Sequence, residues 1–381
     1  MENMQGSKVL LRTDLNLPLK GGEPQKTLRF EKYIETVRKL SEQGAKTAVL
    51  AHQGRPGRDD FTSLEKHAEL LRQELDTEVH FVESILSGEL QRTVEEMSEG
   101  DVALLENVRM MSEELKNMPG DKHADDFYLA KVSRGFDLYI NDGFSVAHRS
   151  QGSIVGIPQL LESRPGPVMK EELKNCRKIG EEFDSGVLVL GGEKPSDLIG
   201  IVEALIDSVD KVLLGGVPGE VALISQGHDL GEKQDWIEER GLDERQDEFA
   251  ELIEKHREKF ELPEDLKTGS GNTRVEKVEG MTWDIGEKTA ERYAEIIEKA
   301  EAALMKGPMG AFEDYPEGTQ NILEALKKCG GFTVMGGGHT SSLVKEFGFS
   351  MDDFDHVSIA GGAFVRTVSG GELPAAEALD I

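Results

Sequence analysis

The sequence has few cysteines and no long apolar run, and both absences narrow its class. The two cysteines among 381 residues, Cys176 and Cys329, form no C-x-x-C pair. This argues against a structural zinc site or a disulfide framework, and it fits a reducing cytoplasm. No run of about 18 apolar residues could cross a bilayer, and residues 1–7 lack the apolar segment of a signal peptide. We therefore expect a cytoplasmic protein without a membrane span.

Positive charge is also scarce. Lys and Arg number 44 against 73 Asp and Glu, which gives a formal charge of 44 − 73 = −29. General binding to nucleic acid or to an anionic membrane surface is disfavoured, because both depend on cations. An anionic small substrate stays possible, since a basic cleft can lie inside an acidic surface. Salt screens the self-repulsion of such a chain, so we expect activity or stability to rise with KCl, as in a halophilic protein.

Two common nucleotide-binding signatures are missing as well. The sequence contains no G-x-x-x-x-G-K-[ST], and no G-x-G-x-x-G opens a helix near the first apolar run. The first absence excludes a P-loop enzyme, and the second counts against a dinucleotide-dependent dehydrogenase. Any phosphate-binding loop in this chain must therefore be of another kind.

Short apolar runs alternate with amphipathic stretches along the chain. The runs that predict strands are Lys8–Thr13, Thr47–His52, Val102–Leu105, Leu138–Ile140, Val187–Leu190, Lys211–Leu214, Ala303–Met305, Phe332–Met335 and His356–Ile359. The stretches that predict helices are Leu28–Gln43, Leu64–Leu75, Asp197–Ile206, Glu287–Lys299, Gly318–Lys328 and Ser341–Phe347. This alternation is typical of parallel sheets covered by helices on both faces. Nine strands are too many for one comfortable sheet, so we expect two α/β domains.

The boundary between these domains is expected near residues 158–182. A Pro/Gly cluster, Arg164–Pro167, precedes a charged helical stretch that contains no strand. We therefore predict a first domain over residues 1–160, a linker helix over 161–182 and a second domain over 183–364. The charged segment Glu238–Lys259 reads as a solvated helix face.

In the second half, four predicted strands run directly into glycine. These segments are Val187–Gly192, Lys211–Gly216, Phe332–Thr340 and His356–Gly362. Glycine lets a backbone approach a ligand closely, and a helix N-terminus behind it attracts an anion. In an open parallel sheet such loops meet at the carboxyl edge, where ligands bind. A tight turn would explain one such loop, but four favour a phosphate-bearing ligand.

In the first half, basic residues collect after the predicted strands instead. They are Arg29, His52, Arg55, Arg109 and Arg149. Guanidinium groups match phosphate and carboxylate oxygens, and several of them converging without an anion repel one another. A surface salt bridge would explain any one of them. Five in so acidic a chain favour a site for an anionic substrate.

Eight segments resemble, in order, successive motifs of the phosphoglycerate kinase family. The four in the first half are Arg12–Pro18, His52–Pro56, Leu105–Arg109 and Asn141–Arg149. The four in the second half are Leu190–Lys194, Lys306–Glu313, Gly336–Thr340 and Ser358–Gly362. The resemblance covers nearly the whole chain, and so many motifs in order are highly specific.

This resemblance implies a fold and a reaction. The fold would be α/β, with two Rossmann-like three-layer domains whose parallel sheets are joined by a hinge helix, and with the tail 365–381 packed back on the first domain. The first domain would bind 3-phosphoglycerate and the second Mg²⁺ with ATP or ADP. The reaction would be 1,3-bisphosphoglycerate + ADP = 3-phosphoglycerate + ATP, in glycolysis or gluconeogenesis, through domain closure and charge stabilisation. The resemblance implies a monomer whose partners are these small molecules only.

The resemblance also assigns residues. The substrate set would be Asp14, Asn16, Arg29, His52, Arg55, Arg109 and Arg149. The nucleotide set would be Lys194, Gly215, Gly216, Glu313, Gly337, Gly338, His339 and Thr340. Arg29 and Lys194 would be catalytic, because both would reach the transferred phosphoryl group. No metal ligand is assigned.

The nucleotide half departs from the family pattern at several positions. Leu198 stands where the pattern has a second lysine, His339 where it has the metal-holding aspartate, and Lys306 where many members have asparagine. Imidazole is a poor substitute for a carboxylate towards magnesium. Two alternatives therefore stay open: a catalytically impaired paralogue that binds 3-phosphoglycerate without transferring phosphate, and, more weakly, an enzyme of another class such as a dehydrogenase.

Overall fold

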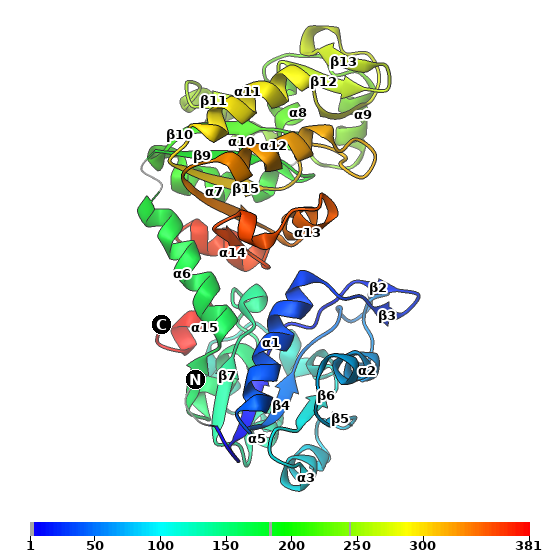
Figure 1. Cartoon of the computed structure of the whole chain (residues 1–381), viewed down its shortest axis with the longest axis vertical. Coiled ribbons are helices and arrows are strands. Elements are labelled where there is room, and N and C mark those ends of the chain that lie inside the picture. The colour runs from blue at the N-terminus through cyan, green and yellow to red at the C-terminus, as the bar shows by residue number, and fades with distance from the viewer. Residues whose placement is uncertain (1–3, 183–184, 244) are drawn as a thin grey trace. The chain divides into compact units, whose positions relative to one another are not determined.

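A computed structural model describes residues 4–182, 185–243 and 245–381, except for the side chains of residues 180–182, 338, 339 and 341. The chain forms two compact units (Figure 1). Unit 1 comprises Met1–Lys174 together with Glu372–Ile381, and unit 2 comprises Asn175–Gly371.

Unit 1 is built on a six-stranded sheet with the order β5-β6-β4-β1-β7-β8, in which every neighbouring pair is parallel. The strands are β1 (Lys8–Arg12), β4 (Lys46–Leu50), β5 (Val79–Val82), β6 (Val102–Leu105), β7 (Leu138–Asn141) and β8 (Ser163–Pro165). A short hairpin of β2 (Leu19–Lys20) and β3 (Glu23–Pro24) leaves the first loop. Because β1 lies in the middle of the sheet, its carboxyl end is flanked by loops from both sides.

Apolar side chains cover both faces of this sheet. On one face Val9 and Leu11 pack with α1 (Leu28–Glu42) and α2 (Glu65–Glu74). On the other face Leu10 packs with α3 (Glu89–Glu96) and α5 (Phe127–Ser133). A short helix, α4 (Gly120–His123), precedes α5. Successive residues of β1 thus point into two different cores, as the period of two of a strand requires.

Unit 2 contains a second parallel sheet, with the order β11-β10-β9-β15-β16-β17. Its strands are β9 (Gly186–Leu190), β10 (Val209–Leu214), β11 (Phe260–Glu261), β15 (Ala302–Lys306), β16 (Phe332–Gly336) and β17 (His356–Val357). The parallel α/β class predicted from the sequence is confirmed in both units. A separate antiparallel sheet of β12 (Asp265–Thr268), β13 (Gly271–Arg274) and β14 (Thr282–Ile285) was not predicted.

The helices of unit 2 alternate with these strands. They are α7 (Ile199–Leu205), α8 (Gly216–Ser225), α9 (Glu232–Glu239), α10 (Gln246–Lys255), α11 (Glu287–Glu298), α12 (Glu317–Lys328), α13 (Gly338–Glu346) and α14 (Gly362–Val368). The charged segment 238–259 contributes to α9 and α10, whose buried residues are few.

One helix and the C-terminal tail connect the two units covalently. Helix α6 (Pro167–Glu182) starts in unit 1, and the division falls within it, between Lys174 and Asn175. The expected linker, residues 161–182, therefore contains β8 as well as this helix. The tail returns to unit 1 from Glu372, so α14 stays in unit 2, and Ala375 on α15 (Pro374–Ala378) donates its amide to the carbonyl of Ala147 at 3.1 Å.

None of the helices in the described part of the chain combines the length and the apolar composition that crossing a membrane requires.

Candidate active site

The carboxyl edge of the unit 1 sheet gathers the predicted substrate residues. Asp14 and Asn16 follow β1, His52 and Arg55 follow β4, Arg109 lies in the 3₁₀ turn after β6, and Arg149 lies in the loop after β7. Arg29 joins them from the first turn of α1, whose N-cap Thr27 accepts a hydrogen bond from the amide of Phe30. Parallel strands end at one edge, so positions far apart in the sequence meet there.

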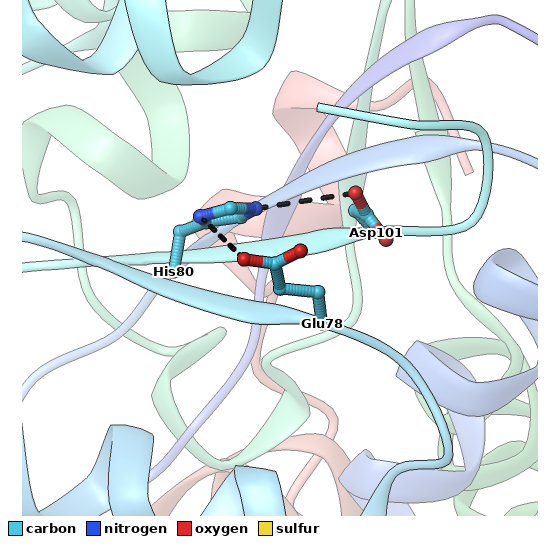
Figure 2. Close-up of side chains that lie close together, drawn as sticks. All are labelled: Glu78, His80 and Asp101. Carbon is cyan, nitrogen blue, oxygen red and sulfur yellow. Dashed lines mark ion pairs between the residues drawn. The ribbon is translucent and has the colours of Figure 1, made fainter. Parts of the chain in front are cut away.

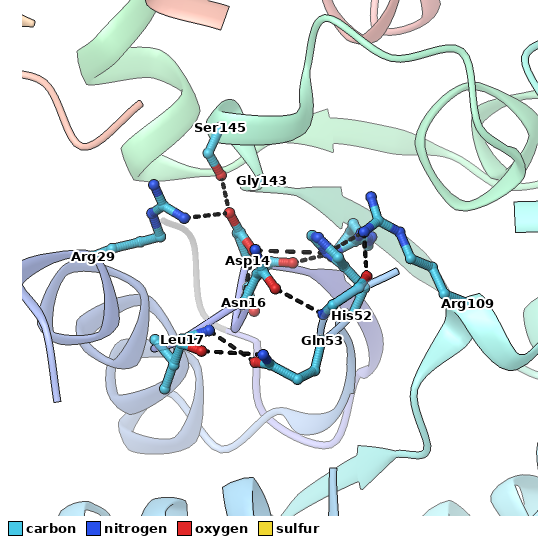
Figure 3. Close-up of polar contacts among 12 residues, drawn as sticks. Asp14, Asn16, Leu17, Arg29, His52, Gln53, Arg109, Gly143 and Ser145 are labelled. Carbon is cyan, nitrogen blue, oxygen red and sulfur yellow. Dashed lines mark hydrogen bonds and ion pairs between the residues drawn. The ribbon is translucent and has the colours of Figure 1, made fainter. Parts of the chain in front are cut away.

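Asp14 is the centre of a polar cluster in this edge (Figure 3). Its carboxylate accepts hydrogen bonds from Arg29 Nη1 at 3.2 Å, from the hydroxyl of Ser145, and from the amide of Asn16 at 2.9 Å. Burial raises the pKa of Asp14, but the Arg29 guanidinium and these hydrogen bonds outweigh it and hold that pKa at about 2. Asp14 is therefore an ionised acceptor at neutral pH.

The loop after β4 lies between the other loops. The amide of Gly54 donates to Asn16 Oδ1 at 2.8 Å, and the carbonyl of Gly54 accepts from Arg109 Nη1 at 2.5 Å. Gly54 has φ +65, and a Cβ there would lie 2.4 Å from the carbonyl oxygen of Asp60, so only glycine fits. Gly54 thus holds the side chains of both Asn16 and Arg109 in place.

A pocket of about 450 Å³ opens at this edge. It is lined by Asn16, His52, Gly54, Arg55, Arg58, Asp59, Asp60, Arg109 and Arg149. Five of the seven predicted substrate residues line it directly, and the other two, Asp14 and Arg29, are joined to Asn16 and His52 in the cluster of Figure 3.

Carboxylates balance the cations of this pocket only in part, since four arginines line it against Asp59 and Asp60, with Asp14 nearby. Burial first, and then the neighbouring guanidinium groups with Arg149 foremost, lower the pKa of Arg109 to about 10, although Asp14 raises it. Burial and the nearby Arg55 also lower the pKa of Arg149. Arg109 Nη2 and Arg149 Nε are buried and make no hydrogen bond to any described residue. Because buried donors without acceptors are costly, their arrangement fits an anion with several oxygens.

Sequence reasoning missed three contributors to the site. Gln53 bonds both the amide and the carbonyl of Leu17, and so ties the loop after β4 to the loop after β1 (Figure 3). Ser145 orients Asp14, and Arg58 adds a cation to the pocket wall. Gln53 and Ser145 lie inside the family motifs, which is the signal that could have found them. Arg58 lies outside the motifs.

In unit 2, the predicted nucleotide loops interlock through their backbones. Gly191 and Gly192 donate to the carbonyls of Lys306 and Pro308, and Gly216 donates to the carbonyl of Met309 at 2.6 Å. A Cβ on Gly191 would lie 2.1 Å from the carbonyl oxygen of Pro308. Several of these glycines are thus required by loop packing. The amide of Gly215, another predicted nucleotide residue, likewise donates a hydrogen bond to the carbonyl of Leu190.

The remaining predicted nucleotide residues lie in the same loops of unit 2. The hydroxyl of Thr340 on α13 accepts a hydrogen bond from the amide of Gly307 at 3.0 Å, and this bond joins the loop after β15 to the helix. Gly337 donates its amide to the carbonyl of Ala360, and Lys194 and Glu313 are exposed. The surroundings of Gly338 and the side chain of His339 lie outside the described part of the chain.

Two departures from the family pattern have clear environments. Leu198 is fully buried at the start of α7, so this position supplies core packing and no charge. Lys306 ends β15 beside Leu190 of β9, and burial lowers its pKa while Asp197 raises it. Lys306 thus places a cation at the carboxyl edge of this sheet, at the end of β15, whereas the family pattern has its second lysine at position 198.

A second cluster of ligating groups lies at the beginning of the unit 1 strands, away from this edge. The imidazole of His80 lies between Glu78, 3.8 Å from Nδ1, and Asp101, 3.9 Å from Nε2 (Figure 2). Among the side chains that the structure describes, this is the one set of three that could hold a metal ion. The two carboxylates face opposite ring nitrogens and so flank the imidazole on two sides.

The family of this chain follows from its match to a protein-family model. The model described as phosphoglycerate kinase matches residues 1–371. The chain belongs to the phosphoglycerate kinase family. Its polypeptide fold is similar to the crystal structure of phosphoglycerate kinase from Pyrococcus horikoshii, with a TM-score of 0.93, 33% identity, and 99% and 97% of the two chains covered.

Curated relatives agree with this assignment. The chain is 40% identical to phosphoglycerate kinase from Halorubrum lacusprofundi, over 98% of this chain and 95% of that protein. It is 38% identical to phosphoglycerate kinase from Haloarcula marismortui, over 98% and 97% of the two chains. The reaction of this family, phosphoryl transfer between ATP and 3-phosphoglycerate, is the reaction of this chain. Nothing found supports the impaired paralogue, and the family match excludes a dehydrogenase.

Proposed function

We propose that 3-phosphoglycerate binds in the unit 1 pocket through the seven residues assigned from the sequence. The observation that carries the proposal is the pair of buried guanidinium nitrogens, Arg109 Nη2 and Arg149 Nε, that have no acceptor in the described chain. A phosphate group offers several anionic oxygens to such donors at once. His52 and Arg55 line the same pocket and would complete the phosphate contacts.

The other end of the substrate would lie towards Asp14 and Asn16. Asp14 is held ionised, so it can accept a hydrogen bond from the substrate hydroxyl. Asn16 lines the pocket and can donate to a substrate oxygen through its side-chain nitrogen. Arg29, bound to Asp14, would extend from this end to the transferred phosphoryl group. In this arrangement the carboxylate that accepts the phosphoryl group faces out of unit 1.

We propose that unit 2 binds ATP or ADP at the interlocked loops after β9, β10, β15 and β16. The N-terminus of α13 would receive phosphate oxygens, and Glu313 would bond the ribose. Lys194 would follow the transferred group, and we add Lys306 to the predicted set because it is a largely buried cation at this edge. The described side chains of unit 2 contain no set of three metal ligands, and Mg²⁺ would arrive with the nucleotide phosphates.

The mechanism that follows is positioning together with charge stabilisation. Phosphoryl transfer needs little covalent work from the protein, and the cations Arg29 and Lys194 would meet the equatorial oxygens of the transferred group. We propose that α6 acts as a hinge, that closure aligns the two substrates, and that closure expels water. The protein would act as a cytoplasmic monomer, in keeping with two cysteines that form no disulfide and with strong negative charge.

The test is a coupled assay together with calorimetric titration of 3-phosphoglycerate. Arg109→Met should abolish measurable 3-phosphoglycerate binding and lower kcat/KM for it by at least about 10³, because a buried donor pair to phosphate is lost. Arg134→Met is the matched control, since Arg134 is exposed in unit 1 and does not line the pocket. Unchanged binding by Arg109→Met would refute the pocket assignment. Size-exclusion chromatography with light scattering tests the monomer.

A further inference from the structure

Behind the substrate pocket, a buried chain of polar groups runs from Glu114 to His52. Ser153 donates its hydroxyl to Glu114 Oε2 at 2.8 Å and its amide to Glu114 Oε1 at 2.5 Å. The same hydroxyl oxygen accepts Arg12 Nε at 3.0 Å, and Arg12 Nη2 lies 3.3 Å from His52 Nδ1. Glu114, Ser153 and Arg12 are 0, 0 and 1% exposed. The chain joins residues up to 141 positions apart in the sequence.

Arg12 does not reach the pocket itself. All three of its guanidinium nitrogens are engaged, since Nη1 donates to the carbonyls of Thr13 and Leu50 while Nε and Nη2 take Ser153 and His52. It is also absent from the pocket lining. Four of its five N–H groups are thus used inside the protein, and because Arg12 does not line the pocket, its effect on the site passes through His52.

The contact with Arg12 fixes the proton of His52. Arginine is a donor only, so His52 Nδ1 must accept and the ring proton must lie on Nε2. The described residues make no hydrogen bond to Nε2, and His52 lines the pocket. Asp14 would favour a proton on Nδ1 instead. Its Oδ1, however, lies 3.7 Å from His52 Nδ1, which is too far for a hydrogen bond, and this oxygen already accepts a hydrogen bond from the amide of Asn16.

The charges around the ring act in the same direction. Burial lowers the pKa of His52 well below its ordinary value, and Arg12 on β1, Arg109 after β6 and Arg149 after β7 lower it further, while Asp14 raises it. Glu114 is linked to Arg12 through the hydroxyl of Ser153; burial raises the pKa of Glu114, while Arg12 and the bonds from Ser153 lower it.

We propose that Arg12, Ser153 and Glu114 are positioning residues that hold His52 as the neutral Nε2–H tautomer, so that His52 gives the substrate a hydrogen bond and no charge. This rests on the proposed role of His52 as a phosphate ligand. The pocket would then recognise its anion with permanent guanidinium charges and one fixed neutral donor. Recognition would therefore not depend on His52 titration near neutral pH.

The test is proton and nitrogen NMR of the full chain labelled with ¹⁵N-histidine. His52 is one of nine histidines, and its signals are assigned by their loss in His52→Gln. We expect an unprotonated Nδ1 and a protonated Nε2 from pH 5.5 to 8 in the wild type. In Arg12→Lys and Ser153→Ala, we expect imidazolium or Nδ1–H signals to appear. Tyr139→Phe is the matched control, because Tyr139 donates to the Ser153 carbonyl and not to the chain of groups.

Binding supplies the second readout. In Arg12→Lys at pH 7.5 the Kd for 3-phosphoglycerate should rise about tenfold, the effect of one lost hydrogen bond to a charged group. The deficit should shrink below about pH 6.5, where imidazolium can form beside Asp14. If Arg12→Lys does not fold, Ser153→Ala, which removes one oxygen, carries the test.

Three results would overturn parts of this account, and they are distinguishable. Imidazolium or Nδ1–H in the wild type at pH 7 refutes the tautomer. An unchanged His52 spectrum in both folded variants refutes positioning by Arg12 and Ser153. The expected tautomer with no change of the Nε2 signal on adding 3-phosphoglycerate refutes His52 as a substrate ligand, while the positioning by Arg12 stands.

Discussion

Removing Arg109 should make the ligand-free protein more stable while it destroys substrate binding. The pKa of Arg109 falls to about 10, which is about 2.5 below its ordinary value. At about 1.36 kcal/mol per unit this corresponds to about 3.4 kcal/mol of cost to the folded state. Solvent in the pocket screens part of that cost, so we take about 2 kcal/mol. Losing the hydrogen bond to the Gly54 carbonyl costs about 1 kcal/mol.

The balance for Arg109→Met is a gain of about 1 kcal/mol. Unit 1 has 174 + 10 = 184 residues, a size at which this gain raises Tm by about 3 °C. Scanning calorimetry without ligand, with circular dichroism, measures the change. Both tryptophans, Trp236 and Trp283, belong to unit 2. Tryptophan fluorescence therefore shows separately whether unit 2 is undisturbed.

Ligand should reverse the order of the two proteins. Saturating 3-phosphoglycerate raises the Tm of the wild type by mass action, and it should leave Arg109→Met unchanged because the variant does not bind it. Arg134→Met should stay within about 0.5 kcal/mol of the wild type in both conditions. A folded Arg109→Met with a Tm at least 2 °C below that of the ligand-free wild type would show that the cations of the empty pocket are not under repulsion.

Three further outcomes are expected. Asp14→Asn should lower the free energy of unfolding at pH 7 by about 2.4 kcal/mol, from (3.8 − 2) × about 1.36. Urea unfolding should show this loss of stability above pH 4, and the loss should vanish as the pH falls from 3.8 towards 2. Lys306→Gln should lower kcat about 10²-fold with little change in the KM for 3-phosphoglycerate, whereas exposed Lys299→Gln should change neither. KCl from low to multimolar concentration should raise activity or stability, and a flat or falling response in either assay would remove the halophilic interpretation of the −29 charge.

The sequence predicted the parts of the fold that have strong apolar periodicity. All nine predicted strands correspond to observed ones, from β1 to β17. The edge strand β5 was missed because His80 and the charged residues before it interrupt its pattern. Helix α8 was missed because Pro218 and Gly219 lie in its first turn and suggest a loop; proline is in fact tolerated there, since the first-turn amides need no helical partner.

The grouping of the site residues was predictable because it depends only on the topology of the sheet. Residues that follow parallel strands must meet at one edge, so spacing along the chain was enough to group Asp14, His52 and Arg109. The bond directions were not predictable, because no local pattern links Glu114 to Ser153 or Arg12 to either of them. Those contacts exist only once rotamers and loops are packed.

The order of the chain has a consequence for biosynthesis. Unit 1 receives its last segment, Glu372–Ile381, only after all of unit 2 has been made. That segment contacts the turn at Gly152–Gly156 and closes a hydrogen bond on Ala147. On the ribosome, unit 1 therefore cannot complete its packing until Glu372–Ile381 has been made, whereas unit 2 needs nothing downstream of Gly371. A premature stop before Glu372 would leave unit 2 whole and damage unit 1, most of which was made first.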